Sequence, residues 1–289
     1  MSIQKFQRSI DIIVESTEPK YFHSNIKICT CLLAIMSSSF KLFYDYFSPL
    51  SRSIIILLEH NKVVYEKTSV ALRKGEHLSK EYGQNVNRHH KVPVIHDNDG
   101  LRLAETVAIY HYLGRKGIIS ERWYPTDVKK LMKIDEFLQW NHNSLLLTTG
   151  SIFYEAWLKH FKDISGTEHG MMKNVRDPTN FVDIHNSLNM LENVWLENKK
   201  FLVDDEPTYA ELIASCALMQ VVGLRLFAID NEKYPKVSRW LQDTKDYFNP
   251  EFDTAHQYIY KYGERFNGPP KIGLTIRAVL FLRNLMNKS

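Results

Sequence analysis

The period of the hydrophobic and polar positions changes once along the chain, in a stretch between residues 117 and 125 that is expected to be a linker. Before it, short apolar or alternating segments that predict strands alternate with segments that are expected to be helices. The apolar run at 53–59 is compatible with a strand or a buried helix, and a helix is expected because the loop before it and Asn61 after it leave room for one crossover. The strands are expected at residues 42–46, 63–70, 92–95 and 101–103, and the helices at 53–59, 76–85 and 108–113. The last two strands flank Asp97-Asn98-Asp99-Gly100, a strong hairpin signal.

Beyond the linker the pattern is helical throughout. Thr126 is expected to cap a long helix whose apolar positions run to Leu145, and a second helix is expected over residues 180–198. Thr208 and Glu211 form a Thr-x-x-Glu capping box before an apolar helix. A basic, amphipathic segment closes the chain.

The order strand, helix, strand, helix, strand, strand, helix resembles that of a thioredoxin-like domain. The sequence thus predicts an α/β thioredoxin-like N-terminal domain (βαβ-α-ββα) followed by an all-α helical C-terminal domain, with a substrate pocket between them. The expected limits are an N-terminal extension at 1–39, the thioredoxin-like domain at 40–117, a linker at 118–125, the helical domain at 126–267 and a C-terminal amphipathic helix at 268–289.

Composition fits a globular protein, since 44% of the 289 residues are hydrophobic and 24% are charged. The net charge of +4 is too small for an obvious nucleic-acid footprint. The three cysteines form neither a disulfide framework nor zinc-ligand spacing, which favours a reducing compartment such as the cytoplasm. His89 and His90 are adjacent on a loop without a carboxylate cluster, so no metal site is predicted.

No apolar run approaches the ~18 residues that span a bilayer. The run Ile28 to Met36 has nine residues and is followed by three serines, as in a signal peptide, but acidic residues precede it. Residues 1–39 are therefore expected to be a poorly ordered extension or, if Met36 is the initiator, absent from the mature protein. A peptide from residues 1–35 in the natural protein would exclude the second alternative.

Ser48 and Ser51 follow the first predicted strand, where redox members of the thioredoxin-like fold carry Cys-x-x-Cys. A serine cannot form a disulfide, but it can donate a hydrogen bond to a thiol that comes from elsewhere. The loop therefore points away from dithiol redox chemistry and toward activation of a bound thiol.

Five short motifs carry a resemblance to a known family. They are LFYDYFS at 42–48, HLS at 77–79, KVPVI at 91–95, ETVAI at 105–109 and IDEFLQW at 134–140. In this order and spacing the chain resembles the glutathione transferases over residues 40 to about 265. Within that superfamily it most resembles the theta class, especially insect members.

The resemblance implies glutathione as cosubstrate, with its sulfur near Ser48. A free thiol has a pKa of about 8.5, so a hydroxyl that donates to the sulfur would lower that pKa and favour the thiolate. The alternative for Ser48 is an ordinary helix N-cap. Ser51 ranks second as the activating hydroxyl.

The resemblance also implies a cis peptide bond at Val92-Pro93, which would turn the backbone of Val92 toward the cysteinyl part of glutathione. Thr106, at a helix start, would bind the γ-glutamyl carboxylate and Glu105 the γ-glutamyl ammonium. Lys91 and His77 would meet the glycyl carboxylate at the other end.

Two positions depart from the theta pattern. Pro49 and Leu50 follow the serine, where Gln and Pro are common, and Leu146 stands where an arginine often points at the thiol. Leucine cannot hold a thiolate electrostatically, so these departures put the rate of catalysis in question more than the fold.

The predicted protein is a cytoplasmic homodimer that conjugates glutathione to small hydrophobic electrophiles or reduces organic hydroperoxides, without metal or other cofactor. An apolar wall for the electrophile is expected from the helical domain, with candidates Tyr44, Leu146, Phe153 and Trp157. The final segment would cap the site or, alternatively, touch a membrane surface. The rival functions are a glutathione-fold ligand-binding protein with little catalysis and a structural, partner-binding module.

Overall fold

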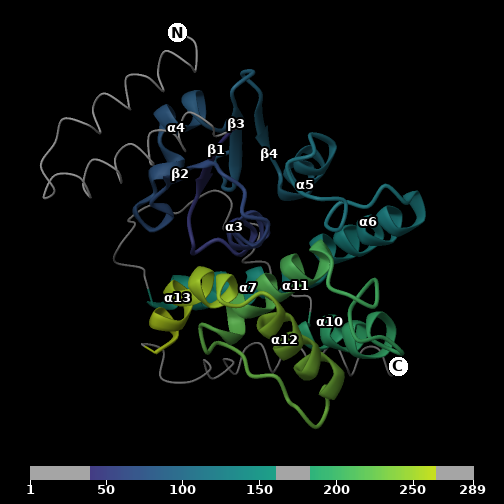
Figure 1. Cartoon of the computed structure of the whole chain (residues 1–289). Helices are drawn as coiled ribbons and strands as arrows, with labels where there is room; N and C mark the ends of the chain where they lie inside the picture. The colour runs from purple at the N-terminus through teal and green to yellow at the C-terminus, as the bar shows by residue number, and fades with distance from the viewer. Residues whose placement is uncertain (1–39, 161–182, 265–289) are drawn as a thin grey trace, which may run out of the picture.

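A computed structural model of the chain describes residues 40–160 and 183–264, with the side chains of 157–160 left out (Figure 1). The predicted N-terminal extension and the C-terminal basic segment lie outside these residues, as does the side chain of Trp157.

Four strands form one mixed sheet in the order β2-β1-β3-β4. The central strand β1 (Phe40–Tyr44) pairs in parallel with β2 (Glu66–Ser69) and antiparallel with β3 (Val94–Asp97), which pairs antiparallel with β4 (Arg102–Ala104). The connecting elements are α3 (Pro49–His60), the 3₁₀ turns η1 (Leu72–Lys74) and η2 (Glu76–Leu78), α4 (Lys80–Asn85) and α5 (Thr106–Arg115). This is the predicted thioredoxin-like order.

Several boundaries in this sheet domain differ from the prediction by a few residues, and two of these differences have a local cause. Helix α3 begins four residues earlier than expected, because Ser48 caps it and Pro49 fits its first turn. Strand β3 begins at Val94 because Pro93 has no N–H to donate to a ladder. The apolar run from Ile54 to Leu58 is buried on all sides because α3 lies between the sheet and the helical domain (Figure 1).

The helical domain contains α6 (Val128–Asn143), α7 (Leu145–His160), α10 (Ile184–Met190), a π-helical turn η4 (Leu191–Trp195), α11 (Tyr209–Val222), α12 (Pro235–Tyr247) and α13 (Glu251–Gly263). Helix α11 is buried along almost its whole length and packs against α3, α6, α7 and α12. One hydrophobic cluster runs through both domains. Among the described helices, none is long and apolar enough to cross a membrane.

The helices of the second domain correct two predictions and confirm a third. Asp127, not Thr126, caps α6, and its carboxylate accepts from the N–H groups of Lys129 at 2.8 Å and Lys130 at 3.1 Å. The predicted long helix also breaks at Ser144, between α6 and α7. The capping box of Thr208 and Glu211 is present as predicted.

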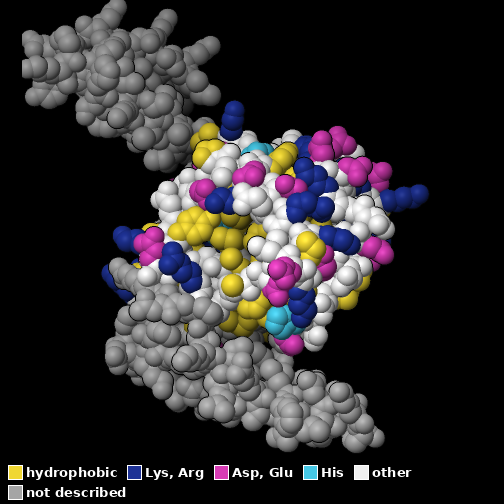
Figure 2. Space-filling view, turned by 90° about the horizontal axis from the view of Figure 1, so that it is seen from below, with side chains coloured by type: hydrophobic (Ala, Val, Ile, Leu, Met, Phe, Trp, Pro, Cys, Tyr) yellow, Lys and Arg dark blue, Asp and Glu magenta, His cyan; other side chains and the backbone are white. Residues whose placement is uncertain are grey.

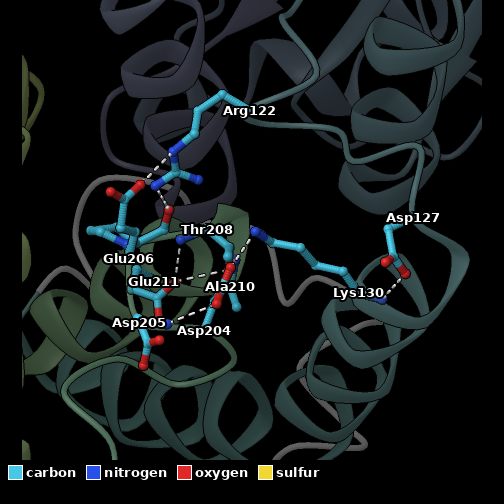
Figure 3. A network of polar contacts seen from close by, with 10 residues as sticks. Arg122, Asp127, Lys130, Asp204, Asp205, Glu206, Thr208, Ala210 and Glu211 are labelled. Atoms are coloured by element: carbon cyan, nitrogen blue, oxygen red, sulfur yellow. Dashed lines mark hydrogen bonds and ion pairs between the residues drawn. The ribbon is translucent and has the colours of Figure 1, made fainter.

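Ion pairs fasten the segment that joins the domains to the turn before α11 (Figure 3). Arg122 pairs with Glu206 at 2.9 Å and donates to the carbonyl oxygen of Pro207 at 2.7 Å. Lys130 pairs with Asp204. The connection between the domains is thus held to the helical domain at Arg122, and the first turn of α6 is held to the same region through Lys130.

The face seen from below in Figure 2 carries several patches of hydrophobic side chains. Lysine and arginine side chains lie beside aspartate and glutamate between these patches. In the part of this face that the structure describes, neither sign of charge forms a continuous surface, in keeping with the small net charge of +4.

Candidate active site

The turn between β1 and α3 is fixed by the Asp45 carboxylate. Its Oδ1 accepts from the N–H of Phe47 at 2.8 Å, its Oδ2 accepts from the N–H of Leu72 at 3.0 Å, and the Ser48 N–H donates to the Asp45 carbonyl at 2.9 Å. Burial raises the pKa of the Asp45 carboxyl, and the N–H groups of Phe47 and Leu72 and the nearby Arg73 charge oppose that rise. The turn therefore has a defined shape before any ligand binds.

Ser48 is half-buried at the end of this turn, as the N-cap of α3. Its Oγ accepts a hydrogen bond from the Ser51 N–H at 3.2 Å, a contact that uses an oxygen lone pair and leaves the hydroxyl hydrogen unused. No other hydrogen bond of this hydroxyl is made to the described residues. The capping role that we considered as the alternative is thus real, and it is compatible with donation to a thiol.

Ser51, the second candidate, lies in the core. Its side chain is fully buried, and its Oγ has no hydrogen-bond partner among the described residues. A hydroxyl covered by protein on all sides is less suited than Ser48 to meet a ligand that arrives from solvent.

Val92 precedes a cis peptide bond to Pro93, as predicted. The chain before it is anchored, because the Lys91 carbonyl accepts from the Tyr82 hydroxyl and from the Asn87 side-chain amide, each at 2.9 Å. The backbone N–H and C=O of Val92 itself make no hydrogen bond to other described residues. An extended peptide could pair with these two groups.

Glu105 and Thr106 mark the start of α5. Glu105 is exposed and has φ 68° and ψ 119°, a conformation uncommon for a residue other than glycine. Thr106 is only 4% exposed, and its Oγ1 has no partner among the residues that the structure describes. Backbone strain and an unsatisfied buried hydroxyl thus occur at neighbouring residues, a combination found at ligand sites.

Lys91 and His77 lie at one corner of the sheet domain. The Nδ1 of His90, the residue before Lys91, is 2.7 Å from the carbonyl oxygen of His77, so the two predicted residues are brought into the same neighbourhood. The Lys91 side chain is exposed, whereas that of His77 is partly buried.

Aromatic rings from three elements meet beside the serine turn. Phe47, next to Ser48, packs edge-on against Phe153 of α7 at 5.3 Å and against Tyr262 of α13 at 5.7 Å between ring centroids. Arg73 of η1 lies over the Tyr262 ring at 4.7 Å. Phe153 was predicted for this wall, while Tyr44, 9% exposed, belongs mainly to the core, and Leu146 is partly buried.

Sequence reasoning missed Phe47, Arg73 and Tyr262. Phe47 carried a local signal, because it precedes Ser48. Arg73 and Tyr262 are 189 residues apart, and no pattern in a single sequence reports such a pairing.

Fold and site together define a thioredoxin-like domain with a hydroxyl in place of the redox cysteine, joined to a helical domain. The family profile described as Glutathione S-transferase, N-terminal domain, matches residues 38–115, and that described as Glutathione S-transferase, C-terminal domain, matches residues 177–244.

Similar proteins agree with these profiles. Glutathione S-transferase theta-1 of Bos taurus is 32% identical over 223 residues, which cover 76% of this chain and 89% of that protein. Glutathione S-transferase T1 of Arabidopsis thaliana is 32% identical over 241 residues, covering 81% and 94%.

Solved structures extend the likeness to three dimensions. Human glutathione S-transferase T1-1 in its apo form has a TM-score of 0.65 at 31% identity, covering 86% of this chain and 98% of that one. Human glutathione transferase theta-2, solved in complex with glutathione and an unknown ligand, has a TM-score of 0.65 at 27% identity, covering 84% and 98%.

The chain therefore belongs to the glutathione transferase family, in its theta class, and is a transferase enzyme. The predicted family, class and fold are confirmed. The closer likeness to insect members stays a prediction.

Proposed function

We propose that this transferase activates glutathione through the Ser48 hydroxyl and conjugates it to small hydrophobic electrophiles. The observation that carries the proposal is the state of that hydroxyl, which is half-buried, is held by a fixed turn and has a hydrogen that no acceptor among the described residues takes. Donation to the sulfur stabilises the thiolate and lowers the pKa of the thiol. The thiol proton leaves to water, the sulfur attacks the electrophilic carbon, and the leaving group departs with its bonding electrons.

Glutathione would lie along the edge of the sheet domain. The Val92 backbone would pair with the cysteinyl residue, as in strand addition. Thr106 Oγ1 and the N–H groups at the start of α5 would bind the γ-glutamyl carboxylate, with Glu105 at the γ-glutamyl ammonium. Lys91 and His77 would meet the glycyl carboxylate. The complex of human theta-2 with glutathione supports this ligand class.

The electrophile would bind against Phe47 and Phe153, beside the sulfur. These two rings pack edge-on against each other beside the serine turn and give it an apolar surrounding that suits flat, apolar molecules. Organic hydroperoxides are a second substrate class for the same thiolate. Here the sulfur attacks the terminal peroxide oxygen to give the sulfenic acid of glutathione and an alcohol. The thiol of a second glutathione then attacks that sulfur and displaces hydroxide, which gives the disulfide and water.

The test is a comparison of two neighbouring serines. Ser48→Ala should lower the rate of conjugation to a benzyl halide by about 100-fold at pH 6.5, because two pKa units of thiol activation correspond to that factor. Ser51→Ala should change the rate by less than about threefold, since its hydroxyl is buried away from solvent. A larger loss in Ser51→Ala than in Ser48→Ala would contradict the assignment.

A homodimer in the cytoplasm that uses no other cofactor completes the proposal. Sedimentation of the purified chain tests the dimer, and the expected mass is twice 33.9 kDa. A monomer at micromolar concentration would exclude the homodimer and would leave the proposed activation of the thiol by Ser48 unaffected.

A further inference from the structure

Arg52 is a fully buried cation at the boundary between the two domains. It belongs to α3, one turn after Ser48, and its backbone N–H donates to the Ser48 carbonyl at 3.1 Å. Its Nη1 donates to the carbonyl oxygen of Tyr46 at 2.8 Å. Its Nη2 donates to Gln220 Oε1 at 2.8 Å and to the carbonyl oxygen of Cys216 at 3.1 Å, both on α11.

The three acceptors of the guanidinium are neutral. Its Nε has no hydrogen-bond partner among the described residues. Burial lowers the pKa of Arg52 to about 10, so the side chain stays charged at neutral pH. A buried charge without an opposite charge bonded to it usually destabilises a fold relative to a well-packed apolar side chain. A contribution to the stability of the fold therefore does not by itself explain why an arginine occupies this position.

A second contact joins the same two helices without a charge. The Ser53 hydroxyl donates to the Leu50 carbonyl at 2.9 Å, and the Tyr209 hydroxyl on α11 lies 3.0 Å from the Ser53 Oγ. What Arg52 adds to this neutral tie is the bond to Tyr46, two residues before Ser48. Arg52 thus connects the serine turn of one domain to the central helix of the other.

We propose that Arg52 is a positioning residue, which holds the turn from Tyr46 to Ser48 against α11 and thereby keeps the Ser48 hydroxyl directed at the glutathione sulfur. The inference rests on the proposed role of Ser48. It predicts that movements of α11 relative to α3 change thiol activation, although α11 itself contributes no group to the proposed glutathione contacts.

Two substitutions loosen this arrangement. Arg52→Lys keeps the charge, but one ammonium cannot reproduce the fork that reaches Tyr46, Cys216 and Gln220 together. Gln220→Leu leaves Arg52 in place and removes the side-chain acceptor on α11. The matched control is Tyr209→Phe, which removes the neutral tie between the same helices and does not touch the turn.

The measurement is the ultraviolet absorbance of the thiolate of bound glutathione against pH, on the full-length protein at saturating glutathione, with melting temperatures alongside. Arg52→Lys and Gln220→Leu should each raise the pKa of the bound thiol by about one unit and lower kcat about tenfold at pH 6.5, with KM for glutathione changed less than about threefold. Tyr209→Phe should lower the melting temperature and leave the thiol pKa unchanged.

An unchanged thiol pKa in both variants, with only a lower melting temperature, would overturn the positioning role and leave that of Ser48 intact. An equal rise of the thiol pKa in Tyr209→Phe would overturn it as well, because that variant leaves the turn intact. If Arg52→Lys does not fold, Gln220→Leu decides alone in the same way. If the wild-type protein binds glutathione with the thiol pKa of the free tripeptide, both the role of Ser48 and that of Arg52 fall.

Discussion

Helices α3 and α11 both begin with a hydroxyl cap, but the two hydroxyls have different surroundings. Thr208 of α11 is buried, accepts from the Ala210 N–H at 3.2 Å and donates to Glu211 Oε2 at 2.9 Å (Figure 3). Ser48 of α3 is half-buried and accepts from the Ser51 N–H at 3.2 Å, with no acceptor for its hydrogen among the described residues. The hydrogen of the Thr208 cap is donated within its own helix, whereas no described residue accepts that of the Ser48 cap, which is the hydrogen proposed to meet the thiol.

A structural hydroxyl at a helix start can thus be distinguished from a chemically active one by whether the fold supplies an acceptor for its hydrogen. A capping residue saturated by its own helix contributes to stability. A capping residue whose hydroxyl hydrogen has no acceptor in its own helix can both cap the helix and donate to a ligand. Its contribution to stability is smaller than that of a cap whose hydrogen is also bonded. Substitution of Ser48 should therefore lower mainly the activity, and substitution of Thr208 mainly the stability.

The largest expected effect is on chemistry. Ser48→Ala should lower kcat about 100-fold at pH 6.5 and the free energy of unfolding by less than about 1 kcal/mol, because the lost cap contact is half-exposed. Urea denaturation and initial rates measure the two quantities on one preparation. A loss of several kcal/mol in stability with little loss in kcat would reverse the assignment of the two caps.

Thr208→Ala is the converse. It should lower the free energy of unfolding by about 2 kcal/mol, since it leaves the Ala210 N–H and the buried Glu211 carboxylate short of a partner. The pKa of bound glutathione should not change. Thr208→Ser keeps the hydroxyl and should restore most of the stability. If Thr208→Ala instead raised the thiol pKa, the two caps would not be functionally separate.

The capping box at Thr208 could be predicted from the sequence because all its interactions lie within four residues. The order of strands and helices could be predicted for the same reason, since each period is local. The burial of Ser51 and the contacts of Arg52 could not be predicted, because they depend on how α11 packs on α3, more than 160 residues away in sequence. The position of the candidate site could thus be predicted from the sequence, but the contacts with α11 that hold it in place could not.

A fall in pH should lower the stability of the fold through one buried histidine of the helical domain. Burial lowers the pKa of His256 on α13 well below its ordinary value, and the charges of Arg52 and Lys245 act in the same direction. A depressed pKa contributes stability above the unfolded-state value of about 6.5, and this is lost as the pH falls toward the folded-state value. Each pH unit below 6.5 should therefore cost about 1.4 kcal/mol through His256.

His256→Phe keeps the stacking on the Phe252 ring, at 4.2 Å between centroids, and removes the titration. The loss of unfolding free energy between pH 7.5 and 5.5 should shrink by about 1.4 kcal/mol in this variant. His142→Gln, at an exposed position of α6, is the control and should leave the loss unchanged. An identical acid loss in wild type and His256→Phe would show that other groups cause it.

Thr106→Val tests a third hydroxyl at a helix start, one that is buried and has no hydrogen-bond partner among the described residues. The isosteric change should raise KM for glutathione about tenfold, because a charge-assisted hydrogen bond to the γ-glutamyl carboxylate is lost. Stability should stay the same or increase, since no bond within the protein is broken. Thr106→Ser should keep the low KM. An unchanged KM in Thr106→Val would remove Thr106 from the site.

The smallest effect is expected at the glycyl end. Lys91→Ala should raise KM for glutathione about threefold at low ionic strength and by less at 0.5 M salt, since an exposed charge is screened. Lys80→Ala, also exposed, is the control. Because the Lys91 carbonyl is anchored by Tyr82 and Asn87, the backbone should not move. A larger rise of KM in Lys91→Ala than in Thr106→Val would show that the glycyl end of glutathione contributes more to binding than the γ-glutamyl end.

The Ser48 hydroxyl, whose hydrogen no described residue accepts, is proposed to activate the thiol, and the thiolate absorbance of bound glutathione against pH tests this role most directly. Wild-type protein should show a midpoint well below the value of about 8.5 for a free thiol, and Ser48→Ala a midpoint near that value. Thr208→Ala should titrate like the wild type. An unshifted midpoint in wild-type protein saturated with glutathione, or the same low midpoint in Ser48→Ala, would contradict the account.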